Sequence, residues 1–247
     1  MAIARVQKKA GTKIGGLGTT IAITLDATPI AGNMLLMGIF TNRTTGTSGV
    51  SSIAQTNVTW TKVYSLEHIS WDGEGTYQFG TLDLWVGVVA ASPGATATVT
   101  LVAGSLSACA EVFEYSGQHA TPLDKISAST VAPGLHPTTG VTAATAEADE
   151  LAIGFSAVDA AGSTNVCVDN GGQATQITDT SISTNVMKLI SYEGLAEAVG
   201  TKEGKSLMLP VPSLYGTSGI IATYKQAAAA ALANGYKQLN VGIGISI

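Results

Sequence analysis

Charged residues are scarce in this sequence. They make up only 12% of its 247 residues, whereas 45% are hydrophobic, and the formal net charge is −5. A protein that holds nucleic acid needs clustered lysine and arginine against the phosphates, so this balance argues against nucleic acid as a partner. The high hydrophobic content argues equally against a disordered chain.

Long hydrophobic runs are missing as well. No apolar stretch reaches the roughly 18–20 residues that cross a bilayer, and no apolar segment follows the basic N-terminal residues as it would in a secretion signal. We therefore expect a soluble, unprocessed chain with no membrane partner. The chain has two cysteines, Cys109 and Cys167, which are too few for a disulfide framework. Each lies in an apolar stretch, and we expect both to be buried free thiols.

Catalytic and cofactor motifs are lacking too. The stretch GTKEGKS at 200–206 resembles the end of a phosphate-binding loop, but its first glycine is misplaced, and the SLMLPVP stretch overlapping its end is typical of a strand, so we expect a charged hairpin turn. Glu111 and Glu114 are expected on opposite faces of one strand, which excludes a carboxylate pair. No histidine has a second ligand at zinc spacing: His68, His119 and His136. We expect no enzyme, and no catalytic, cofactor-binding or metal-binding residue.

The sequence is rich instead in β-branched residues and in glycine, of which there are 29. This composition favours short strands joined by turns. In ATATVTLV, Ala97, Val99 and Leu101 alternate with threonines, which predicts a strand with one buried face. The run MLLMGIF at 34–40 is continuously apolar and predicts a central strand that is covered on both faces.

Strand-like segments of the same types occur twice in the same order, which predicts two related halves at about 20–117 and 147–225. An aromatic-ended strand closes each half, with Phe113 and Tyr115 matched by Tyr224. We therefore predict an all-β fold, an antiparallel β-sandwich of jelly-roll-like type that spans 20–225. The proline-containing connection from 118 to 146 is the expected crossover between the halves.

Both ends of the chain differ from this middle part. We expect residues 1–19 to form a basic arm. This arm is either a solvated tail or a segment that docks on an acidic partner surface. The pattern of residues 226–247 predicts a short alanine-rich helix followed by a terminal strand. This strand either completes a sheet of the same subunit or adds to a sheet edge of a neighbour. The side chains predicted to make assembly contacts are Arg5, Lys8, Lys9, Lys13, Val241, Ile243, Ile245 and Ile247.

Aromatic residues are only 6% of the chain, yet several crowd around Trp71. Trp60 and Trp85 lie in apolar strands and are expected in the core. Trp71 precedes Asp72 in a polar stretch and is the predicted exposed residue, where a flat ring could stack on a glycan. Asp72 and Glu74 could supply oxygen ligands to calcium, but a solvated turn is the favoured interpretation.

Six motifs together resemble a family of β-sandwich structural proteins of tailed phages and prophages: AGNMLLMGIF, NVTWTKV, LDLWVGVVAASPGATATVTL, ACAEVFEYSG, PLD and EADELAIGFSAV. The resemblance covers roughly residues 20–225. The chain departs from the pattern at Asn57-Val58, where a Gly-Asn turn is expected, and in its alanine-rich C-terminal extension.

The resemblance implies a virion location and no catalytic residue. It implies a capsid decoration or spike subunit, whose partners are copies of itself and other virion proteins such as the major capsid protein. The alternative is a carbohydrate-binding or receptor-binding module.

Overall fold

The computed structural model describes residues 2–13, 19–43, 48–71, 77–103, 107–131, 136–159, 166–170, 174–182, 187–209 and 217–228. Within these residues the chain forms fifteen strands and no helix. The strands are β1 (Ala4–Lys13), β2 (Thr20–Thr24), β3 (Met34–Arg43), β4 (Val50–Ala54), β5 (Val58–Trp71), β6 (Tyr77–Val89), β7 (Thr96–Leu101), β8 (Ser107–Ser116), β9 (Gln118–Val131), β10 (Glu150–Asp159), β11 (Val166–Asp169), β12 (Thr175–Ile182), β13 (Met187–Glu197), β14 (Ser206–Leu209) and β15 (Thr217–Gln226).

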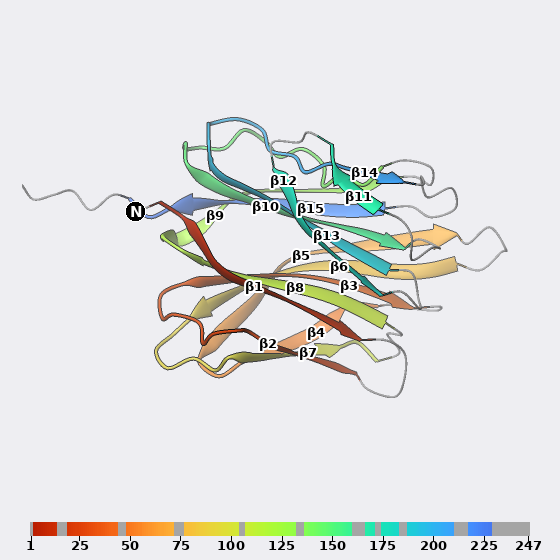
Figure 1. Ribbon diagram of the computed structural model, residues 1–247, viewed down its shortest axis with the longest axis horizontal. Coiled ribbons are helices and arrows are strands. Elements are labelled where there is room, and N and C mark those ends of the chain that lie inside the picture. The colour runs from red at the N-terminus through yellow and green to blue at the C-terminus, as the bar shows by residue number, and fades with distance from the viewer. Residues whose placement is uncertain are drawn as a thin grey trace, which may run out of the picture.

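Two five-stranded antiparallel sheets stack face to face, which confirms the predicted all-β sandwich (Figure 1). Sheet I has the order β1-β8-β3-β6-β5, and sheet II has the order β12-β13-β10-β15-β9. A three-stranded sheet, β2-β7-β4, covers the outer face of sheet I, and the β11-β14 ribbon lies on the outer side of sheet II. The molecule is therefore built in four layers.

The main core lies between sheets I and II. Phe40 and Phe113 of sheet I meet Phe155 and Ile220 of sheet II, and the ring centroids of Phe113 and Phe155 are 5.9 Å apart. Each fully buried apolar side chain of this size contributes about 1.5–3 kcal/mol to folding. The two sheets approach closely at Gly38, where a Cβ atom would lie only 2.3 Å from Cδ1 of Phe155. A side chain at position 38 would therefore push the sheets apart.

The burial of the strands follows their sequence patterns. In β3, nine residues in a row are buried, because Leu36 and Phe40 face sheet II while Leu35 and Met37 face the β2-β7-β4 sheet. The continuous apolar run thus lies in a central strand covered on both faces, as predicted. In β7 the predicted alternation is confirmed, since the apolar side chains are buried and the threonines between them are exposed or half-buried.

Sheets I and II have the same strand order when β1, β3, β5, β6 and β8 are matched with β9, β10, β12, β13 and β15. The turn before each central strand contains a residue with positive φ: Gly32 at 86° before β3, and Asp149 at 63° before β10. Tyr115 pairs with Met34 in sheet I, as Tyr224 pairs with Leu151 in sheet II. When the strands are matched in this way, the first half begins with the edge strand β1 and the second half begins with the edge strand β9. The expected crossover at 118–146 opens with the 14-residue strand β9 rather than with an irregular connection.

The N-terminal segment is not an arm outside the sandwich, contrary to the prediction. Most of it forms β1, which pairs with β8 from Ala4↔Ser116 to Lys13↔Ala108. The reason is that an edge strand gains its order from backbone hydrogen bonds to its neighbour and needs no apolar pattern of its own. Among the side chains of this segment that the structure describes, Ile3, which is 7% exposed, is the one that enters the core.

The predicted C-terminal segment begins at Gln226, which is the last residue of β15. Residues 229–247 lie outside the described residues, and so do the predicted alanine-rich helix and terminal strand. The same holds for the predicted contact residues Val241, Ile243, Ile245 and Ile247.

Candidate functional site

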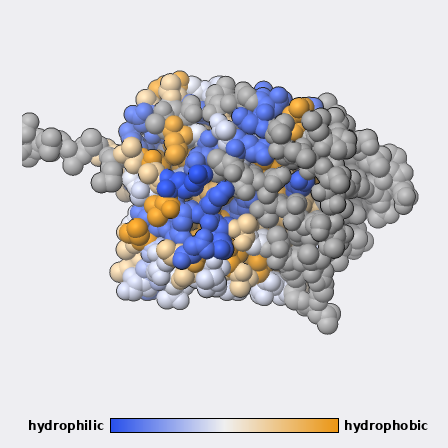
Figure 2. All heavy atoms as spheres, in the orientation of Figure 1, coloured by the Kyte–Doolittle hydropathy of each residue, from blue (hydrophilic) through white to orange (hydrophobic). Residues whose placement is uncertain are grey.

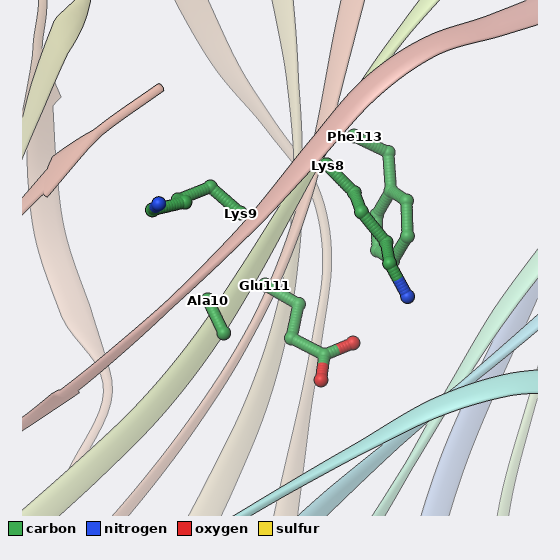
Figure 3. A pocket seen from close by; sticks show the side chains of 5 residues that line it. All are labelled: Lys8, Lys9, Ala10, Glu111 and Phe113. Atoms are coloured by element: carbon green, nitrogen blue, oxygen red, sulfur yellow. The ribbon is translucent and has the colours of Figure 1, made fainter. Parts of the chain in front are cut away.

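A half-open hollow of about 130 Å³ lies beside the edge strand β1. Its lining residues are Lys8, Lys9, Ala10, Glu111 and Phe113. The side chains of Lys8 and Glu111 extend to the same side, while Lys9 extends away from them (Figure 3). Cross-strand register explains this, because Lys8 pairs with Phe113 and Ala10 with Glu111. Glu111 is only 1% exposed, and none of the lining residues that the structure describes is a serine, cysteine or histidine. The described lining combines charged side chains with the apolar side chains of Ala10 and Phe113.

A polar contact near this hollow ties β1 to sheet II. Arg5 Nη1 donates to Glu193 Oε2 at 3.0 Å, and the Tyr115 hydroxyl donates to Glu193 Oε1 at 2.7 Å. Burial and the neighbouring carboxylate of Glu193 raise the pKa of Tyr115 well above its usual value. Tyr115 therefore stays neutral and acts as a hydrogen-bond donor. Hydrophilic side chains gather over the part of the molecular face where β1 runs (Figure 2).

Glu114 holds the turn that precedes β3. This buried carboxylate accepts hydrogen bonds from the Ile30 amide at 2.7 Å, from Asn33 Nδ2 at 2.7 Å and from Gln7 Nε2 at 2.5 Å. Its strand neighbour Glu111 lines the hollow on the other face, which confirms that the two carboxylates do not form a pair. The role of Glu114 is to position the turn.

Asp124 and Glu150 form a carboxylate pair that sequence reasoning missed. Asp124 Oδ1 lies 3.1 Å from Lys125 Nζ and 3.4 Å from Lys225 Nζ, and Asp124 Oδ2 accepts from the Ala146 amide at 2.9 Å. Burial by itself would raise the pKa of Asp124, but the hydrogen bonds from Ala146 and Lys125 lower it overall. Burial, together with the charge of Asp124, raises the pKa of Glu150.

This pair resembles a general-acid arrangement in its opposed pKa shifts. Glu150 is only 1% exposed, however, so its carboxyl cannot touch a substrate in this structure. The pair instead joins the start of β10 to β9. Sequence reasoning missed it because Asp124 lies in the stretch expected to be the crossover between the halves.

Trp60 and Trp85, two of the aromatic residues near Trp71 in the sequence, differ in burial. Trp85 is buried as predicted, at 7% exposed, whereas Trp60 is only half-buried and packs against the core under the β2-β7-β4 sheet. Trp71 is the last residue of β5 and is the register partner of Tyr77, but its side chain is outside the described part of the structure. Asp72 and Glu74 lie outside the described residues.

The GTKEGKS stretch does not form the charged hairpin turn predicted for it. It runs alongside the segment before β10, with the Thr139 amide donating to Gly204 O at 3.0 Å and the Thr142 amide to Lys202 O at 2.9 Å. It leads into strand β14, so it does not open a helix that could receive phosphate.

The remaining predicted features concern cysteine, histidine and metal sites. Cys109 is buried, as predicted, and the side chain of Cys167 is not among those described. His119 bonds locally, to Thr121. In the described part of the chain no three His, Cys, Asp or Glu side chains are grouped so that they could hold a metal ion. No helix there is long and apolar enough to cross a membrane.

The basic residues predicted as assembly contacts all lie on β1. Arg5 is bound to Glu193, and Lys9 Nζ lies 2.5 Å from Asp26 Oδ1, so both make contacts within their own subunit. Lys8 lines the hollow, and the side chain of Lys13 is not described.

Comparisons of the chain with protein-family models, with curated proteins and with solved structures give no match.

Proposed function

We propose that this protein is a structural subunit of a tailed-phage virion, either a capsid decoration protein or a spike subunit, and that it acts by self-association and by binding the shell. The observation that carries the proposal is the four-layer stack, in which the faces of sheets I and II are used for internal packing. Strand edges and loops then form the surface offered to partners. The resemblance of the 20–225 motifs to phage structural proteins supports the same role.

In this proposal β1 replaces the expected free arm as the basic contact surface. Four basic residues, Arg5, Lys8, Lys9 and Lys13, lie along β1 at the edge of sheet I, and Arg5 and Lys9 also make ion pairs within the subunit. A surface of this charge suits an acidic region of the major capsid protein, since exposed charges steer association at low ionic strength. The C-terminal residues 237–247 supply a second, apolar contact, because alternating valine and isoleucine side chains need to be covered.

Mass spectrometry of purified particles from the phage or induced prophage that encodes the chain tests this role. The protein should be present in intact particles, and its absence would overturn the proposal. Deletion of residues 237–247 tests the anchoring segment. A truncated chain that stays folded, keeps its oligomeric state and still binds particles would refute the anchoring role.

Glycan binding remains the alternative activity, because Trp71 and Tyr77 are register partners at the end of the β5-β6 pair. Paired aromatic residues at a strand end can offer ring faces to a sugar. A glycan array with the intact protein and with Trp71→Ala decides this. Signals that persist unchanged in the variant would exclude Trp71 as the contact.

A further inference from the structure

The free edge of β5 has fewer protective features than the edges of β1 and β9. This 14-residue strand closes sheet I, and its outer side pairs with no other described strand. The opposite edge, β1, carries four basic residues, and the edge strand β9 contains Pro122 and two register shifts. Basic residues, proline and irregular pairing are the devices that keep edge strands from adding to another sheet. β5 has no proline, and from 58 to 67 its only charged residues are Lys62 and Glu67.

The side chains of β5 are self-complementary in one antiparallel register. Tyr64 and Leu66 are partners of Leu84 and Leu82, so they lie on the face toward sheet II. Tyr64 is 38% exposed, while Leu66 packs in part against the core. If two copies of the chain meet about a two-fold axis at Ser65, Tyr64 of each copy lies opposite Leu66 of the other.

The same register matches charge with charge. The pairing of β5 with β6 shifts between Lys62 and Tyr64, which leaves Val63 unpaired. If Val63 is likewise unpaired across the two-fold axis, Lys62 lies opposite Glu67 of the second copy. Both residues are on the face toward the β2-β7-β4 sheet, since their partners on β6 are Trp85 and Thr81. Opposite charges directly across antiparallel strands favour pairing.

Lys62 has a donor left for this contact. Its ammonium donates to Val50 O at 2.9 Å and lies 3.2 Å from Asp83 Oδ1. Nζ also lies 5.3 Å from the centroid of the Trp85 ring. An ammonium has three N–H donors, so one remains after its two contacts with oxygen atoms. Its side chain is 34% exposed and can therefore meet a carboxylate from outside.

We propose that β5 is a self-association edge, through which two copies of this chain join their sheets antiparallel about a two-fold axis at Ser65. The inference rests on the self-association in the proposed function and names its surface. The pairing continues sheet I into the second copy and leaves β1 and the C-terminal segment available for the shell. The isologous contact closes after two copies, so it yields a dimer and not a fibre.

Sedimentation velocity of the full chain over a range of concentrations tests the dimer. The intact protein should sediment as a species of twice its 25.0 kDa mass. Tyr64→Arg places a cation opposite Leu66 in both copies and should weaken dimerisation on the order of tenfold or more, because two cross-strand contacts are lost. Tyr64→Phe keeps the ring and should leave the dimer intact. The matched control is Val6→Arg, which adds the same charge at an exposed apolar position on β1, the other edge of sheet I.

Disulfide trapping tests the register. Ser65→Cys should form an intermolecular disulfide under mild oxidation, because residues that face each other on the axis have Cβ atoms close enough for a bond. Thr61→Cys lies away from the axis and should not cross-link. The intact chain, with its two native cysteines, gives the background.

The outcomes separate this edge from the broader role. A chain that is monomeric at every concentration, or a dimer that survives Tyr64→Arg and is not trapped by Ser65→Cys, overturns the β5 contact. Virion incorporation of Tyr64→Arg would then still stand as evidence for the structural role. A β5 dimer in a protein that is absent from particles would support the edge and overturn the virion role.

Discussion

Tyr115 and Tyr224 occupy matching positions in the two sheets but differ in how their hydroxyls are satisfied. Tyr115 donates to Glu193, whereas the buried hydroxyl of Tyr224 has no hydrogen-bond partner among the described residues. Burial raises the pKa of Tyr224. A buried polar group without a partner destabilises the folded state, since it has lost its water.

The two tyrosines should therefore respond in opposite directions to the same substitution. Tyr224→Phe should raise the free energy of unfolding by about 0.5–2 kcal/mol, because it removes an unsatisfied hydroxyl. Tyr115→Phe should lower it by about 1.5–3 kcal/mol, because it removes a hydrogen bond to a charged group. Urea denaturation measures both, and changes of the same sign would contradict the assignment.

Glu150 predicts a pH-dependent effect. Its pKa is raised in the folded protein, so its charged form is disfavoured there, and the carboxylate costs stability once the pH is above that pKa. Glu150→Gln is uncharged at every pH, and its amide can still accept from the Glu147 amide and donate to Asp124. The variant should gain stability over the native chain at pH 7, and this gain should shrink as the pH falls toward 4.5, the usual value for glutamate.

Thermal unfolding of both proteins at several pH values measures this difference. The matched control is Glu147→Gln, which changes the charge of a residue in the same turn by the same amount. An advantage of Glu150→Gln that does not change with pH would exclude the carboxylate charge as its cause.

At the scale of single residues, the sequence predicted where a side chain lies in its strand better than it predicted which residue that side chain contacts. The match between Tyr115 and Tyr224 could be predicted because both close an apolar strand. The partner of Tyr115 could not be predicted, since Glu193 lies 78 residues further along the chain and reaches it only when the sheets stack. The contact between Asp124 and Glu150 could not be predicted from the sequence for the same reason.

At the scale of elements, strands were predictable where burial imposes a pattern. The run in β3 and the alternation in β7 both reflect which faces are covered. β1 and β9 have no such pattern, because edge strands are ordered by one neighbour and bury few side chains. Their backbone hydrogen bonds to β8 and β15 therefore cannot be predicted from the sequences of β1 and β9.

β1 should depend on its contact with sheet II more than on its surface ion pair. Arg5→Ala removes a partner from Glu193, whose side chain is only 8% exposed, and should destabilise the protein by about 1–2 kcal/mol. Lys9→Ala breaks a pair with Asp26, which is 68% exposed, and should cost about 0.5 kcal/mol or less. Hydrogen exchange should show faster exchange across β1 in Arg5→Ala only. Equal exchange in the two variants would rule out the Arg5 contact as the tie.

At the scale of the whole molecule, the two halves resemble the subunits of a dimer joined by a turn. Each half supplies one five-stranded sheet, and the main core lies between them. The link is short, because β8 ends at Ser116 and β9 begins at Gln118, with Gly117 at φ 80° between them. A half alone would expose its core face to water, which would favour association.

Fragments 1–117 and 118–247 should therefore fold when they are produced together and aggregate or unfold when each is produced alone. Buried apolar side chains on both inner faces supply the driving force, while the missing covalent link costs only the entropy of association. A tag on one fragment should retain the other, and the complex should give the circular dichroism spectrum of the intact chain. Gly38→Leu in the first fragment is the control, since any Cβ there collides with Phe155. It should abolish the complex, and retention of the second fragment by this variant would contradict the stacking of the two sheets as the force that joins the halves.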